Sequence, residues 1–206
     1  TPCGTLFPYT TLFRSVALLN YAMGAMNPEY SKKILPLAKK AGFAKILLVG
    51  SEHVLTIGVP KNEKEQITQK KQITTLENKI AGVLNVANEI GFDEVYIYGR
   101  DEPSTPNGVA QNKIIADIVH RNGGQIAAAI VYDKFRRPLE KILDVPIMNW
   151  SVATSQCELT KLLSEGKSIP HKKAWYYSNR EAKHTNAVRA GFGWYLYKSN
   201  YQGNIP

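Results

Sequence analysis

Short apolar runs bounded by turn-forming residues recur along the chain. Continuous runs of this kind are typical of strands whose two faces are both buried, as in a parallel sheet. The sequence therefore predicts strands at Lys45–Val49, Val95–Tyr98, Gln125–Val131, Val145–Met148 and Ala174–Tyr177.

Amphipathic helical patterns lie between these runs. The longest carries an apolar stripe at three- and four-residue steps and ends at Gly91; the stripe consists of Ile73, Leu76, Ile80, Val83, Leu84, Ala87 and Ile90. Asn27-Pro28 predicts an earlier helix start, because a capping side chain is followed by proline in the first turn. Pro36 lies inside that helix and Gly42 ends it. Further helices are predicted to begin at Thr105-Pro106, Arg137-Pro138, Ser155 and Glu181.

Repeated helix–strand units joined by short loops imply a parallel sheet with right-handed crossovers. Both an open doubly wound sheet and a closed barrel satisfy this pattern. The nucleotide-binding fingerprint of open sheets is absent, since Gly191-Phe192-Gly193 lies inside a helical pattern and lacks the third glycine. We therefore favour one α/β domain over residues 16–206, an incomplete (β/α)8 TIM-like barrel missing its N-terminal part and its final strand.

Residues 1–15 are excluded from the predicted domain. The stretch Thr5–Ser15, TLFPYTTLFRS, resembles the continuous translation of a sequencing-library adapter. The alternative is an ordinary apolar leader, but the stretch has no basic segment before it and no small-residue cleavage site. We expect native sequence to begin near Val16.

Composition narrows the classes of function. The chain has 206 residues, of which 44% are hydrophobic, and this is enough for one sizeable core. The net charge of +9 would suit a polyanionic partner, but the basic residues are spread over helices, so solvated helix faces are favoured and nucleic acid is not expected. No apolar run approaches the length of a membrane span. Cys3 and Cys157 alone form neither a disulfide framework nor a metal-binding pattern.

Candidate catalytic residues follow the second predicted strand. In a barrel, reacting groups lie at the carboxyl ends of strands, and VYIY is followed there by Gly99, Arg100 and then Asp101-Glu102-Pro103. Two adjacent carboxylates tend to raise the pKa of one of them, which suits a general acid. The alternative for this short motif is a solvated acidic turn.

Side chains at other predicted strand ends would complete the site. Sugar rings stack on aromatic side chains, and their hydroxyls bond to Asn and His. We expect substrate contacts from His53, Tyr132, Asn149, Trp150, Trp175 and Tyr177. For the aromatic residues the alternative is core packing. The histidines show no metal-ligand spacing, so neither a metal nor another cofactor is expected.

Three segments resemble family 123 glycoside hydrolases and the related domain-of-unknown-function family 4091. They are YIYGRDEP, KAWYYSN and AVRAGFGWYLYKSNYQGNIP, and the resemblance covers roughly residues 40–206. The matching residues are Asp101, Glu102, Trp175, Tyr177, Arg189, Trp194 and Gly203.

The resemblance implies a barrel that hydrolyses 2-acetamido sugars, such as β-linked N-acetylgalactosamine, by substrate-assisted retention. Glu102 would protonate the departing glycosidic oxygen and later activate water. Asp101 would orient the acetamido group, whose carbonyl oxygen attacks the anomeric carbon. Tyr132 or Tyr177 would bond that acetamido oxygen, and no cofactor is implied.

Three rival interpretations stay open. One is a glycosidase in which Asp101 or Glu102 is a direct nucleophile. A second is a noncatalytic carbohydrate-binding barrel that keeps the aromatic mouth. The third, a basic nucleic-acid-binding module, lacks both a basic cluster and a recognisable reading motif.

Overall fold

Helices and strands alternate through most of the part of the chain that the computed structural model describes, residues 16–19, 26–131, 133–149, 175–177 and 203–205. The strands are β1 (Val16–Leu19), β2 (Lys45–Leu48), β3 (Glu94–Tyr98), β4 (Gln125–Ile130), β5 (Val145–Asn149), β6 (Trp175–Tyr177) and β7 (Gly203–Ile205). The helices are α2 (Pro28–Lys40), α3 (Glu63–Ile90), α4 (Pro106–Arg121), α5 (Asp133–Glu140) and the short 3-10 helix η2 (Ser51–His53).

All these strands form one parallel sheet in which each strand pairs with the next along the chain, in the order β1 to β7. The predicted α/β class with parallel strands is therefore confirmed. Each of the five apolar runs becomes a strand within one residue of its predicted ends. The apolar runs do not predict β1 or β7, and Gly203–Ile205 has only one apolar residue.

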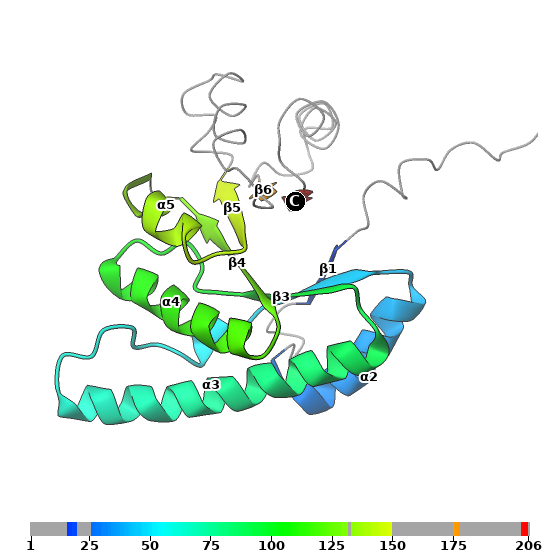
Figure 1. Ribbon diagram of the computed structural model, residues 1–206, viewed down its shortest axis with the longest axis horizontal. Helices are drawn as coiled ribbons and strands as arrows, with labels where there is room; N and C mark the ends of the chain where they lie inside the picture. The colour runs from blue at the N-terminus through cyan, green and yellow to red at the C-terminus, as the bar shows by residue number, and fades with distance from the viewer. Residues whose placement is uncertain (1–15, 20–25, 132, 150–174, 178–202, 206) are drawn as a thin grey trace, which may run out of the picture.

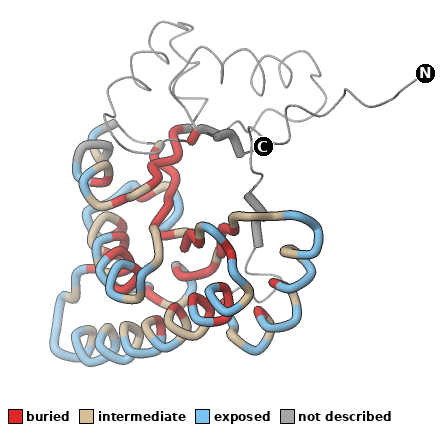
Figure 2. Tube along the Cα trace, turned by 45° about the vertical axis from the view of Figure 1, so that its right-hand side comes forward, coloured by how far each residue is buried: buried red, intermediate tan, exposed pale blue. Residues whose placement is uncertain are grey.

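Two apolar clusters lie on opposite faces of the sheet, because successive strand residues point to opposite sides. On one face, residues such as Ile46, Leu48 and Ile97 pack against the buried residues of the helices. On the other face, a smaller cluster consists of Leu47, Tyr96, Ala127, Val145, Ile147 and Trp175, with Tyr98 packed against it. We call this second group the strand-face cluster. The described helices wrap the first face, and burial is concentrated along the strands (Figures 1 and 2).

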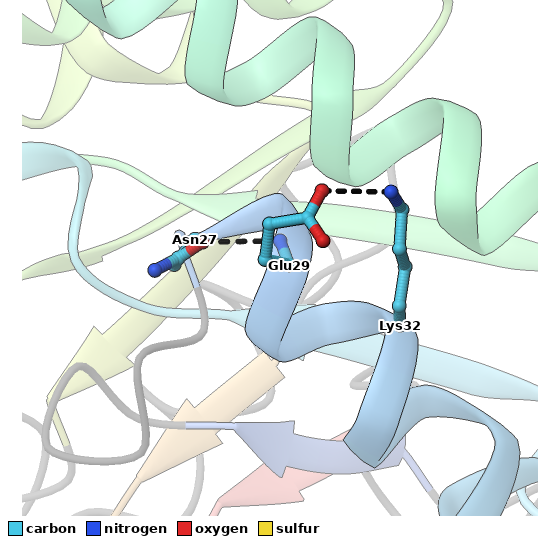
Figure 3. A network of polar contacts seen from close by, with 3 residues as sticks. All are labelled: Asn27, Glu29 and Lys32. Atoms are coloured by element: carbon cyan, nitrogen blue, oxygen red, sulfur yellow. Dashed lines mark hydrogen bonds and ion pairs between the residues drawn. The ribbon is translucent and has the colours of Figure 1, made fainter.

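Local capping signals define the helix ends. The Asn27 side chain accepts a hydrogen bond from the Glu29 backbone at 3.0 Å, and Glu29 binds Lys32 at 2.7 Å (Figure 3). The hydrogen bond between the Lys32 and Glu29 side chains and the charge of Glu29 raise the pKa of Lys32 above its usual value. Thr105 caps α4 in the same way, and Gly91, with a φ of 82°, ends α3. These ends agree with the prediction.

One predicted helix start is wrong. Arg137-Pro138 is typical of a first turn, but the chain is already helical from Asp133, and Pro138 lies inside α5. Proline in a first turn is a preference and not a requirement, so Arg137-Pro138 does not fix the start of a helix that begins at Asp133. The helices predicted from Ser155 and Glu181, and residues 1–15, lie outside the described residues. In the described part, no helix is both long and apolar enough to cross a membrane.

Candidate functional site

The loop between β3 and α4 is fixed at its start by Asn112 of α4. This side chain is fully buried, and its Oδ1 accepts a hydrogen bond from the Arg100 backbone N–H at 2.7 Å. Its Nδ2 donates to the Arg100 carbonyl oxygen at 3.1 Å. A side chain at Gly99 would collide with Asn112 Oδ1, so glycine is required where the loop leaves the strand. Asn112 therefore sets the backbone path immediately before Asp101.

Asp101 lies at the carboxyl end of β3 and is held by the last residue of that strand. The Tyr98 hydroxyl donates to Asp101 Oδ1 at 2.5 Å. Tyr98 itself packs against the strand-face cluster, so this hydrogen bond ties an exposed carboxylate to the face of the sheet opposite the helices. A charge-assisted hydrogen bond of this kind orients the carboxylate.

Glu102 adopts an unusual backbone conformation. Its φ is +40°, and it is the only non-glycine residue with a positive φ in the described part of the chain. Pro103 follows and is buried, packed so closely on Gly108 that an added Cβ there would lie 2.9 Å from the Pro103 Cβ. Left-handed backbone at a non-glycine residue persists only where the surroundings impose it, and such residues cluster at functional sites.

Glu102 also lines a pocket of about 310 Å³ between the loop after β2 and the loop after β3. Polar residues dominate the lining and include Thr56, Arg100, Thr105, Asn107 and Gln111. The two adjacent carboxylates thus have different surroundings: Asp101 is bound to Tyr98, and Glu102 lies in the wall of the pocket.

The far wall of the pocket is held by two buried or half-buried amides of α4. Asn107 Oδ1 accepts hydrogen bonds from the backbone N–H groups of Gly58 and Val59, both at 2.9 Å. Gln111 Nε2 donates to the Leu55 carbonyl oxygen at 3.0 Å. These contacts fix the loop after β2 against the start of α4.

Helix α3 fixes the same loop from its other side. Gln69 Nε2 donates to the carbonyl oxygens of Ile57 and Gly58, and Gln72 Oε1 accepts from the Thr56 backbone N–H at 3.1 Å. The loop polar groups are thus hydrogen-bonded to side chains of two helices, and the pocket is preformed rather than dependent on a ligand for its shape.

The other predicted site residues are described in less detail, or lie outside the described residues. His53 is exposed in η2 at the same edge of the sheet, after β2, and nearby Ser51 donates its hydroxyl to the Tyr98 carbonyl oxygen. Asn149 and Tyr177 pair in register at the carboxyl ends of β5 and β6, but their side chains are not described. Tyr132 and Trp150 lie outside the described residues.

Trp175 lies at the start of β6 and not at its carboxyl end. It is 5% exposed and packs edge-to-face on Tyr96, with ring centroids 5.0 Å apart and an interplanar angle of 70°. This is the core-packing arrangement that the sequence left open as an alternative. A substrate contact from Trp175 stays a prediction.

The sequence did not single out Gln111, which lines the pocket, or Asn112, which holds the loop beside it. Asn112 and Gln111 lie in the helical pattern of α4 among apolar positions that are buried, such as Ile115 and Val119. Buried polar side chains need hydrogen-bond partners, so two consecutive amides on the apolar side of a helix are a readable signal for a polar anchor. Among the described residues, no group of three His, Cys, Asp or Glu side chains could hold a metal ion.

Comparison with known proteins adds no assignment. A scan against protein-family models finds no match, and a search of functionally described proteins finds no significant similarity. Function is therefore inferred from the site itself.

Proposed function

We propose that the protein is a glycoside hydrolase for 2-acetamido sugars, with Glu102 as general acid and base and Asp101 orienting the acetamido group. One observation carries the proposal: two consecutive carboxylates at the carboxyl end of β3 have unlike surroundings, one bound to Tyr98 and one in a pocket wall on strained backbone. Acid–base chemistry by two carboxylates needs this kind of difference, because one must hold a proton while the other stays charged.

In the proposed reaction, Glu102 donates a proton to the glycosidic oxygen as its bond to the anomeric carbon breaks. The acetamido carbonyl oxygen forms a bond to that carbon, giving an oxazolinium ion, while Asp101 accepts a hydrogen bond from the acetamido N–H. Glu102, now a carboxylate, then takes a proton from the water that attacks the anomeric carbon and reopens the ring. Tyr98 supports this role of Asp101 by holding its carboxylate in one orientation.

A (β/α) barrel is the form of the fold that we propose. The strand order of an open doubly wound sheet reverses at a switch point, whereas the described strands follow one another without reversal. The described helices pack on one face, and the strand-face cluster on the other face would become the barrel interior. Closure would require a further pairing with β1.

The test compares aryl β-glycosides of N-acetylgalactosamine and N-acetylglucosamine with the matching galactoside and glucoside. We expect turnover of the acetamido sugars alone, since substrate assistance needs the acetamido carbonyl. Equal turnover of the galactoside would instead indicate a direct carboxylate nucleophile. Binding of the sugars without turnover of any would indicate a noncatalytic binding module and would overturn the proposal.

The role of Glu102 is tested by Glu102→Gln, with Glu89→Gln on the exposed face of α3 as the matched control. Loss of a general acid typically lowers the rate by about 10²–10⁴-fold. The loss should be larger for an alkyl glycoside than for an aryl glycoside, because a poor leaving group needs the proton more. An equal loss for both leaving groups would contradict the acid role.

A further inference from the structure

The pocket beside Glu102 has a charge pattern that a neutral sugar does not require. Of the nine described residues that line it, Arg100 is the only cation and Glu102 the only anion, while Thr56, Asn107 and Gln111 are uncharged hydrogen-bonding residues. A guanidinium group presents several N–H donors in one plane and matches a carboxylate or a sulfate with two parallel hydrogen bonds.

The backbone of Arg100 is fixed, which limits where its side chain can reach. Asn112 binds both the N–H and the C=O of Arg100, so the residue enters the pocket wall from one defined position. The opposite wall is fixed by Asn107 and Gln111 through their hydrogen bonds to the loop after β2. The backbone on both sides of the pocket is therefore held before a ligand binds, which lowers the entropy cost of binding.

We infer that this pocket binds an anionic substituent of the sugar, a carboxylate or a sulfate ester, through Arg100, next to the glycosidic bond on which Glu102 acts. The inference rests on the proposed function for the identity of the ligand as the substrate of Glu102. The protein's net charge of +9 supports it, because a positive field raises the local concentration of an anionic ligand.

The size of the pocket agrees with this ligand class. Its volume of about 310 Å³ is at the lower end of small-molecule sites, which suits one sugar ring with its substituent better than a longer chain. Thr56, Asn107 and Gln111 would bond to ring hydroxyls while Arg100 binds the anion. The chemistry shared by uronic acids and sulfated sugars is the anion, and the experiment separates the two.

The test is calorimetric binding of the full chain to the methyl glycosides of three 2-acetamido sugars: N-acetylgalactosamine, its 6-uronic acid and its 6-sulfate ester. Hydrogen bonds to charged groups contribute about 1.5–3 kcal/mol, so the anionic sugars should bind at least about tenfold more tightly than the neutral one. Whichever anion binds more tightly identifies the substituent. Equal affinities for all three sugars, or no binding of any, would overturn the inference.

Arg100→Gln should remove the preference for the anionic sugars over the neutral one. Arg100→Lys keeps the charge but loses the planar fork, so it should retain only part of the preference. Arg121→Gln is the matched control, because Arg121 is an exposed arginine at the far end of α4 that pairs with Glu77. An undiminished preference in a folded Arg100→Gln protein would refute the role of Arg100.

Hydrolysis is measured separately, so the two proposals fail independently. Anionic sugars that bind through Arg100 without turnover of any glycoside would leave this inference standing and refute the proposed hydrolase. Turnover of acetamido glycosides with no preference for an anionic sugar, in binding or in kcat/KM, would refute this inference and leave the proposed hydrolase standing.

Discussion

Asn112→Ala is the substitution that most directly tests how the loop between β3 and α4 is held. The side chain is 0% exposed and makes two hydrogen bonds to the backbone of Arg100, at 2.7 and 3.1 Å. Each lost hydrogen bond costs about 1 kcal/mol net, and a buried group left without a partner costs about 1–3 kcal/mol. Because Arg100 is an exposed residue, we take the lower end of this range, and the sum is about 2–3 kcal/mol.

Helix propensity opposes this loss. Alanine is favoured over asparagine inside a helix by about 0.5 kcal/mol, so the net cost should be about 2 kcal/mol. Asn78→Ala is the matched control, since Asn78 is exposed within α3 and its replacement changes propensity alone. It should leave stability within about 0.5 kcal/mol of the parent or raise it slightly.

Urea unfolding followed by circular dichroism measures both variants. The midpoint of Asn112→Ala should fall while the slope of free energy against urea stays unchanged, because the exposed surface on unfolding is the same. If the free energy of unfolding of Asn112→Ala lies within about 0.5 kcal/mol of that of Asn78→Ala, the hydrogen bonds from Asn112 to Arg100 do not hold the loop and the reasoning is refuted.

Two further predictions concern ion pairs away from the pocket. Glu94→Gln should lower the free energy of unfolding by about 1–2 kcal/mol, because it weakens a partly buried pair with Lys45 at 2.8 Å; an unchanged urea midpoint would contradict this. Glu29→Gln should lower the Lys32 pKa measured by NMR titration. Since Glu29 raises that pKa in the folded state, the pair's contribution to stability is present below the ordinary lysine pKa and is lost as pH rises through the raised value. An unchanged Lys32 titration would refute the second prediction.

The local elements of the fold could be predicted because their signals are local. Asn27 and Thr105 cap the helices that they precede, and Gly91 adopts the left-handed conformation that ends α3. The apolar runs become strands because a parallel sheet covered by helices needs continuous apolar sequence. β7 was not predicted because its formation depends on pairing with β6 rather than on its own composition.

The pocket could not be predicted in the same way because its contacts span long stretches of chain. Gln111 binds the Leu55 carbonyl oxygen across 56 residues, and Asn107 binds Gly58 across 49. A sequence pattern identifies Gln111 as a polar residue on a helix but does not identify the loop that it anchors. The sequence does predict that Asp101 and Glu102 follow a strand, because the strand end is a local feature.

The different surroundings of Asp101 and Glu102 have a common physical origin in the loop. Asn112 fixes the chain before the pair and buried Pro103 fixes it after, so the turn is completed at Glu102 with a φ of +40°. Left-handed backbone costs about 1–2 kcal/mol at a non-glycine residue. The two hydrogen bonds of Asn112 contribute a similar amount, about 1 kcal/mol each. The hydrogen bonds of Asn112 thus help to hold the backbone path that keeps Glu102 in the pocket wall in spite of this strain.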